Sequence, residues 1–119
     1  GIHLILLGGV FLPQYEVVVG PPTIAQLKEL HADKLFLGAD GLTFARGVTT
    51  ANMLEAEVDR AAIAAASQVI LVADSSKIGL IGLTTIMPLN DVNKLITDDG
   101  APPDFVGELR RQGVEVILV

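Results

Sequence analysis

Short, unbroken runs of apolar residues constrain this chain more than any other feature. Lys34–Gly38 reads KLFLG, Val69–Ala73 reads VILVA and Glu115–Val119 reads EVILV. A strand with one face in water alternates apolar and polar residues, whereas a strand buried on both faces is apolar throughout. Because helical patterns separate these runs, the sequence predicts an α/β fold with a mostly parallel sheet and helices on both of its faces.

Further strands are expected between and before these runs. They are predicted at His3–Leu7, Glu16–Gly20, Leu83–Met87 and Lys94–Thr97. The first of them is a core-type strand with nothing leading into it, which suggests a chain cut from a longer protein. Residues 1–119 are expected to form one domain, since the length fits a single core.

Three helices are expected between the strands, and their predicted starts are Pro21-Pro22, Asn52 and Pro102-Pro103. Proline is favoured in the first turn of a helix, where its missing N–H leaves nothing unsatisfied. Asn52 and Glu55 fit a capping box, with Thr49 or Thr50 as competing caps, for a helix that continues to about Ser67. Gly113 is a candidate for the end of the last helix.

Composition excludes several functional classes. The chain has 119 residues, a net charge of -6, 50% apolar residues and 18% charged residues, which is the opposite of a disordered composition. Its eight Lys and Arg residues are scattered in an acidic chain, so the chain alone is not expected to bind nucleic acid. No uncharged stretch reaches the ~20 apolar residues that cross a bilayer. The absence of cysteine is compatible with the cytoplasm, and two isolated histidines do not suggest a metal site.

Small and polar residues follow four of the expected strands, in the segments Gly8-Gly9, Gly38–Gly41, Asp74–Lys77 and Thr97–Gly100. In open α/β sheets, ligands bind beyond the carboxyl ends of the strands. A parallel topology would bring these turns to one edge of the sheet. Each turn alone is a weak signal, because strand–helix turns are usually polar and glycine-rich for conformational reasons.

Asp74 and Lys77 are the most informative pair. Lys77 could neutralise an anionic ligand group while Asp74 accepts hydrogen bonds from sugar hydroxyls or orients the lysine. On the local sequence alone, a polar turn with a solvated lysine is the preferred explanation. Gly38, Gly41 and Gly47 either allow a ligand to approach the backbone closely or simply form turns.

The other polar candidates also have structural explanations. Glu55 is explained as a capping-box partner at least as well as by ligand contact. Asp98 and Asp99 precede a predicted helix, whose dipole favours carboxylates there. The chain shows no G-x-S-x-G nucleophile elbow and no glycine-rich phosphate loop.

Taken in order, the motifs resemble a known family. They are Leu7–Gly9, Val19–Pro21, Asp33–Gly41, Gly47–Thr50, Glu55-Ala56, Val72–Lys77 and Ile96–Asp98. The series is similar to the C-terminal effector-sensing domain of DeoR-family bacterial transcriptional regulators, and it spans nearly the whole chain. Ile78 is one departure, because the family commonly has Phe after the lysine.

The resemblance implies a three-layer α/β/α fold with a Rossmann-like sheet, similar to ribose-5-phosphate isomerase and glucosamine-6-phosphate deaminase. It implies a cytoplasmic repressor of sugar metabolism, without a cofactor, whose effector is a phosphorylated sugar or related metabolite. It also implies a homo-oligomer. DNA would be bound only through an N-terminal winged helix-turn-helix that this chain lacks. An early D-x-G-T-T-like loop that holds a phosphate is also lacking, so the chain resembles the later portion of an N-terminally truncated sensor.

The same resemblance suggests which residues bind the effector. Ala73–Lys77 matches an A-D-x-S-K-like segment of the isomerase, which favours Lys77 as the anion contact. The further effector-binding residues that it implies are Asp74, Gly38, Asp40, Gly41 and Glu55. The alternative is an active sugar-phosphate isomerase or deaminase, in which Asp40 or Glu55 could be the general base. A domain that only mediates oligomerisation is a third possibility.

Overall fold

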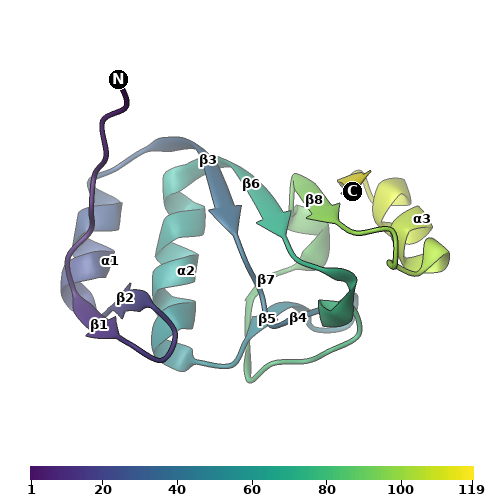
Figure 1. Cartoon of the computed structure of the whole chain (residues 1–119), viewed down its shortest axis with the longest axis horizontal. Coiled ribbons are helices and arrows are strands. Elements are labelled where there is room, and N and C mark those ends of the chain that lie inside the picture. Colours follow the sequence, from purple (N-terminus) through teal and green to yellow (C-terminus); the bar gives the residue numbers. More distant parts are fainter.

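A four-stranded parallel sheet forms the centre of the computed structural model, which describes all 119 residues. Its strands lie in the order β3 (Ala32–Leu37), β6 (Ala66–Val72), β8 (Lys94–Thr97) and β9 (Glu115–Leu118) (Figure 1). All three neighbouring pairs are parallel. The apolar runs therefore form a parallel sheet, as the sequence predicts.

One face of this sheet is covered by the hydrophobic core. Successive side chains of a strand alternate between the two faces, and Leu37, Leu71, Leu95 and Val116 share the buried face. They pack with buried residues of α2 (Met53–Ala65), of α3 (Pro103–Arg111) and of a second, smaller sheet.

The smaller sheet has three antiparallel strands, in the order β4 (Gly41–Thr43), β5 (Gly47–Thr50) and β7 (Thr84–Met87). The strand predicted at Leu83–Met87 is present as β7, but it pairs antiparallel in this smaller sheet and not within the parallel sheet. The hairpin of β4 and β5 was not predicted at all. Two sequence features could have indicated this hairpin: the β-branched residues of β5, and Gly47 at its turn. The φ angle of Gly47 is 76°, in the left-handed region that glycine favours.

The three helices begin near the predicted prolines and asparagine. Helix α1 covers Pro21–Lys28. None of the three helices is both long and apolar enough to cross a bilayer. The Asn52 side chain caps α2 by accepting hydrogen bonds from the backbone N–H groups of Leu54 (2.8 Å) and Glu55 (3.1 Å). Thr49 and Thr50 lie in β5 instead. α2 ends at Ala65, before the predicted Ser67, because Ala66 already begins β6.

The strand predicted at His3–Leu7 is absent. Residues 1–8 form no regular structure, and most of their side chains are exposed. Strands β1 (Val10–Leu12) and β2 (Val17–Val19) then form a separate hairpin. A strand needs a neighbour to complete its hydrogen bonds, and the segment instead lies against α1, where the Gly8 carbonyl accepts a hydrogen bond from the Thr23 hydroxyl (2.7 Å). Gly8-Gly9 therefore lies away from the parallel sheet.

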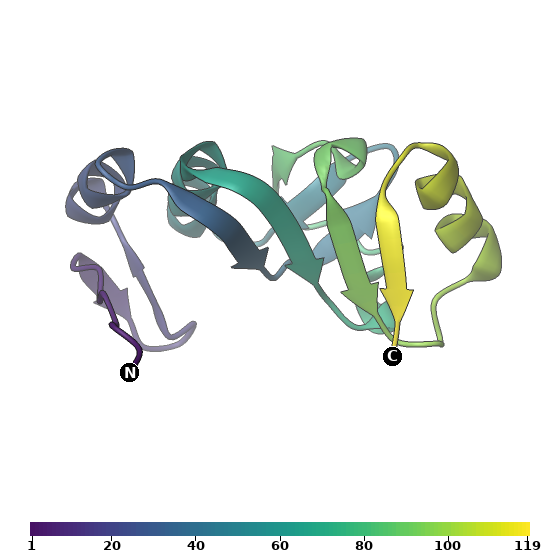
Figure 2. The ribbon, with the colours of Figure 1, turned by 90° about the horizontal axis from the view of Figure 1, so that it is seen from above.

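We call the other face of the parallel sheet the bare face, because no α-helix of this chain covers it, although Ile70 on that face is only 3% exposed. Phe36, Val72 and Ile117 lie on it, and their side chains are 64%, 47% and 37% exposed. The connections β3–β6, β6–β8 and β8–β9 all run in the same direction across the sheet, and right-handed crossovers then place every connection on one side. Figure 2 shows α2, α3 and the smaller sheet together on that side. This chain forms two layers, and the third layer of the α/β/α arrangement stays a prediction.

Candidate functional site

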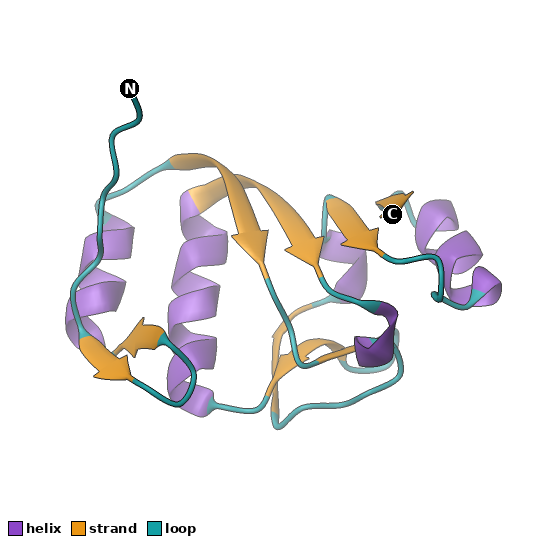
Figure 3. Ribbon diagram, viewed as in Figure 1, coloured by secondary structure: helices purple, strands orange, loops and turns teal.

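Three of the four predicted turns meet at the carboxyl edge of the parallel sheet (Figure 3). Gly38 follows β3, Asp74 lies two residues beyond the end of β6, and Asp98 follows β8. Because β3, β6 and β8 are neighbours, these turns adjoin one another. This edge is therefore the candidate ligand site, without Gly8-Gly9.

The turn after β6 holds the predicted cation. Residues Ser75–Lys77 form a single 3₁₀ turn, η1. The Asp74 carboxylate accepts hydrogen bonds from the Ser76 N–H (2.8 Å) and the Ser76 hydroxyl, and these bonds hold the pKa of Asp74 below its usual value. The half-buried Lys77 makes no salt bridge, so its ammonium group is available to a ligand.

Asp98 has a different role from the predicted complement of a helix dipole. Its carboxylate accepts hydrogen bonds from the Ser75 N–H (2.6 Å), the Ser75 hydroxyl (2.8 Å) and the Gly100 N–H (2.9 Å). The bonds from Ser75, followed by the bond from Gly100, lower the pKa of Asp98. Helix α3 begins only at Pro103, so Asp98 ties two strand ends together instead.

Three carboxylates form a second group beside α2. Asp40 accepts hydrogen bonds from the Ala51 N–H (2.8 Å) and the Thr50 hydroxyl (3.2 Å). Burial and, to a smaller degree, the Asp40 charge raise the pKa of Glu55. Burial, then Glu55 and Asp40, raise the pKa of Asp59 to about 7 despite its neighbour Arg60. No group of three or more acidic or histidine side chains is arranged to hold a metal ion.

Asp59 is not among the site residues predicted from the sequence. The spacing of four residues between Glu55 and Asp59 could have indicated that both carboxylates lie on the same side of the helix. The shift in its pKa depends on burial and on Asp40, which only the fold brings close.

The two predicted site glycines differ in their surroundings. A Cβ at buried Gly41 would lie 2.1 Å from the Leu80 carbonyl oxygen, so the chain itself requires glycine there. A Cβ at exposed Gly38 would meet no atom within 4 Å, which leaves room for a ligand. A bridge between Leu42 and Ile78 connects β4 to the segment just after Lys77, and thereby links the two groups of site residues.

A cavity of about 180 Å³ lies at the ends of β6 and β8. Asp74 is the only predicted effector residue among those that line it, which also include Val72, Ile96, Thr97 and Asp98. Thr97 is 3% exposed, and its buried hydroxyl has no hydrogen-bond partner within the protein. Neither Lys77, Asp40 nor Glu55 lines this cavity.

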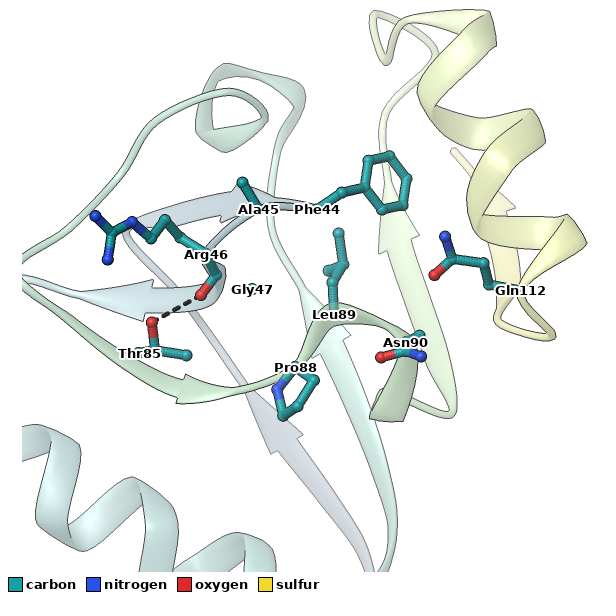
Figure 4. A pocket seen from close by; sticks show the side chains of 9 residues that line it. All are labelled: Phe44, Ala45, Arg46, Gly47, Thr85, Pro88, Leu89, Asn90 and Gln112. Carbon is teal, nitrogen blue, oxygen red and sulfur yellow. Dashed lines mark hydrogen bonds between the residues drawn. The ribbon is translucent and has the colours of Figure 1, made fainter.

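A larger cavity of about 460 Å³ lies elsewhere, between the β4–β5 turn, the 3₁₀ turn η2 (Leu89–Asp91) and the end of α3 (Figure 4). None of the effector-binding residues that the family resemblance implies lines this cavity, although Gly47 does. Arg46 and Gln112 lie on opposite sides of the cavity, and the Arg46 side chain points away from Gln112. The Arg46 carbonyl accepts a hydrogen bond from the Thr85 hydroxyl (2.7 Å). We place the candidate site at the strand ends, because ligands of parallel sheets bind there and Lys77 supplies an unpaired cation.

Comparison with known proteins identifies the family. The sequence profile of the DeoR C terminal sensor domain matches residues 1–99. A protein assigned as aga operon transcriptional repressor in Escherichia coli O157:H7 is 38% identical over 119 residues, which are 100% of this chain and 44% of that protein. The HTH-type transcriptional repressor GlcR of Bacillus subtilis is 35% identical over 118 residues, 99% of this chain and 45% of that protein.

A third relative is the HTH-type transcriptional regulator GlpR of Haloferax volcanii, which is 32% identical over 112 residues, 94% of this chain and 44% of that protein. The chain thus spans less than half the length of these relatives. All three are named as transcriptional repressors or regulators, and the matched profile is that of a sensor domain, as the resemblance implied. The chain belongs to the family of DeoR C-terminal sensor domains.

Proposed function

We propose that this chain is the effector-sensing part of a cytoplasmic transcriptional repressor of sugar metabolism. A phosphorylated sugar or related metabolite binds at the carboxyl edge of β3, β6 and β8, and its binding alters the affinity for an operator. The proposal rests mainly on the observation that the half-buried Lys77 has no ion-pair partner and lies on a turn that is fixed to two strand ends.

The charges at this edge suggest how such a ligand lies. A phosphate group is attracted to Lys77 and repelled by the carboxylates of Asp40 and Glu55. The hydroxyl groups of a sugar can instead donate hydrogen bonds to carboxylates, which in their ionised form accept hydrogen bonds and donate none. Asp74 has one oxygen that carries no hydrogen bond from the protein, so it can take such a hydroxyl.

The proposal also concerns the part of the relatives that lies outside the region shared with this chain. The relatives are more than twice as long as the region they share with this chain. We assign DNA binding to a winged helix-turn-helix in that remainder, and a phosphate-holding loop to a further part of the sensor within it. The bare sheet face and the free edge of β3 are where the third layer would dock. Effector and operator are then coupled through two arrangements of a homo-oligomer with different affinities for each.

The test is a thermal-shift screen of the full-length regulator with ribose 5-phosphate and hexosamine phosphates. A ligand at a hundred times its Kd stabilises a protein by about 2.7 kcal/mol, which is a readily measured shift. We expect Lys77→Ala to abolish this shift. The melting temperature without ligand should hardly change, because replacing a side chain that has no ion-pair partner near the surface usually changes stability by less than about 0.5 kcal/mol.

Lys28→Ala is the matched control, since Lys28 lies at the end of α1 and away from the strand ends. This variant should keep the full ligand shift. A large loss of stability in Lys77→Ala without ligand would show that Lys77 is structural. Steady conversion of a sugar phosphate by the wild-type protein would contradict a sensing role.

A further inference from the structure

We propose that Asp98 is a positioning residue of the effector site, whose carboxylate fixes the turn that carries Lys77. This inference rests on the proposed function, because it concerns the same site. Asp98 itself is not among the effector-binding residues that the sequence suggested. It lies on the loop after β8, whereas the turn that it holds follows β6.

The hydrogen bonds show how the turn is held. The ladder between β6 and β8 ends at the pair Val72 and Ile96, and one more backbone bond follows, from Ala73 N–H to the Ile96 carbonyl (3.2 Å). Beyond that point the Asp98 side chain continues the attachment, with Oδ1 accepting from the Ser75 N–H (2.6 Å) and Oδ2 from the Ser75 hydroxyl (2.8 Å). The first residue of η1 is therefore fixed to the neighbouring strand end at two atoms.

Gly100 provides an independent sign that this contact is tight. Its N–H donates to Asp98 Oδ2 (2.9 Å). A Cβ at Gly100 would lie 2.8 Å from Asp98 Oδ2 and 2.8 Å from Ser75 Oγ, closer than real Cβ atoms approach other heavy atoms. The loop after β8 therefore fits against the carboxylate and the serine with no space for a side chain.

The arrangement requires a carboxylate in particular. Three donors converge on Asp98, and Oδ2 alone receives two of them. An asparagine could keep one oxygen as an acceptor, but its NH₂ group is a donor and would face another donor. Asp98→Asn therefore keeps the size of the side chain while it breaks the contact. Asp99, the next residue, is exposed and has no such hydrogen bonds, so Asp99→Asn is the matched control.

The experiment compares these two variants in the full-length regulator, with ribose 5-phosphate and glucosamine 6-phosphate as probes. Hydrogen exchange of the peptide that contains residues 73–78 reports on the turn without any ligand. We expect Asp98→Asn to accelerate exchange at Ser75 and to weaken probe binding by about tenfold, the effect of losing one charge-assisted hydrogen bond. Asp99→Asn should match the wild type in both measurements.

A serine pair separates positioning from general stability. Ser75→Ala removes only the hydroxyl bond and should weaken probe binding, whereas Ser75→Thr keeps a hydroxyl and should restore it. If Asp98→Asn fails to fold, this pair decides the question. Asp98→Asn with the exchange and affinity of Asp99→Asn would overturn the proposal. If the wild type binds neither probe, the proposed function fails, while exchange at Ser75 still decides whether Asp98 holds the turn.

Discussion

At the scale of single residues, the candidate site separates two kinds of carboxylate. Asp74 and Asp98 are ionised acceptors of several short hydrogen bonds, which lower their pKa values. Glu55 and Asp59 lie in a more buried patch beside Asp40, where desolvation and like charge raise their pKa values. The first pair fixes the backbone of the turns, and the second pair is the more easily protonated.

Asp59 should make the stability of the domain depend on pH. Its pKa is about 7 in the folded chain against a usual value of 3.8, so the folded state binds more protons between these values. The contribution of Asp59 to the free energy of unfolding is therefore largest below about pH 4, and it is lost as the pH rises through 7. Thermal unfolding of the full-length protein between pH 5 and 8 should show this decline, and Asp59→Asn should flatten it.

Glu57→Gln is the control for this measurement, because Glu57 is exposed on the same helix. It removes the same charge and should leave the slope unchanged. An unaltered slope in Asp59→Asn would show that Asp59 ionises normally in the folded protein.

At the scale of elements, the smaller sheet contacts the turn that carries Lys77 at the carboxyl edge of the parallel sheet. β4 begins directly after Asp40, and its residue Leu42 bridges to Ile78 just after the Lys77 turn. The Gly79 N–H also donates to the Leu42 carbonyl (2.9 Å). The position of the Lys77 turn therefore depends on close contact between β4 and the segment after η1.

Two glycine substitutions test this dependence. Gly41→Ala should destabilise the protein by about 1–3 kcal/mol, the usual effect of overpacking, because its Cβ would collide with the Leu80 carbonyl. Gly38→Ala should leave the unfolding temperature nearly unchanged, since its Cβ meets nothing. Chemical denaturation of both variants measures the difference. Equal stabilities would mean that β4 moves freely relative to the segment after η1.

At the scale of the whole molecule, the open sheet face is the most unusual property. Parallel strands are normally covered on both faces. Here the exposed side chains of Phe36, Val72 and Ile117 lie on the bare face, and β3 has a free edge. Because the crossovers within this chain occupy the opposite side, only additional polypeptide can cover the bare one.

Cysteine labelling can detect that cover, because the chain has no cysteine of its own. Phe36→Cys should react readily with a thiol reagent in the isolated 119-residue chain and slowly in the full-length protein, where we expect the third layer. Tyr15→Cys, in the exposed β1–β2 turn, should react at similar rates in both. Mass spectrometry of the labelled peptides gives the rates. Equal labelling of Phe36→Cys in both proteins would exclude a covered face.

Patterns within short segments were predicted correctly from the sequence. The apolar runs that form β3, β6 and β9 and the Asn52 cap of α2 can be recognised from residues that are neighbours in the sequence. The errors lie where partners are distant. Val48–Thr50 forms a strand only because β4 and β7 flank it, and His3–Leu7 forms none because no strand lies beside it.

The candidate site divides in the same way. The sequence by itself determined the chemistry at the strand ends, since Asp74, Lys77 and Asp98 follow recognisable strands. Only the tertiary structure decided that Asp98 holds Ser75, that Gly41 serves the chain's own packing, and that Asp59 has a raised pKa. The physical reason is that hydrogen bonds, steric contact and desolvation act between groups that are close in space, and residues 23 positions apart, such as Ser75 and Asp98, become neighbours only in the folded sheet.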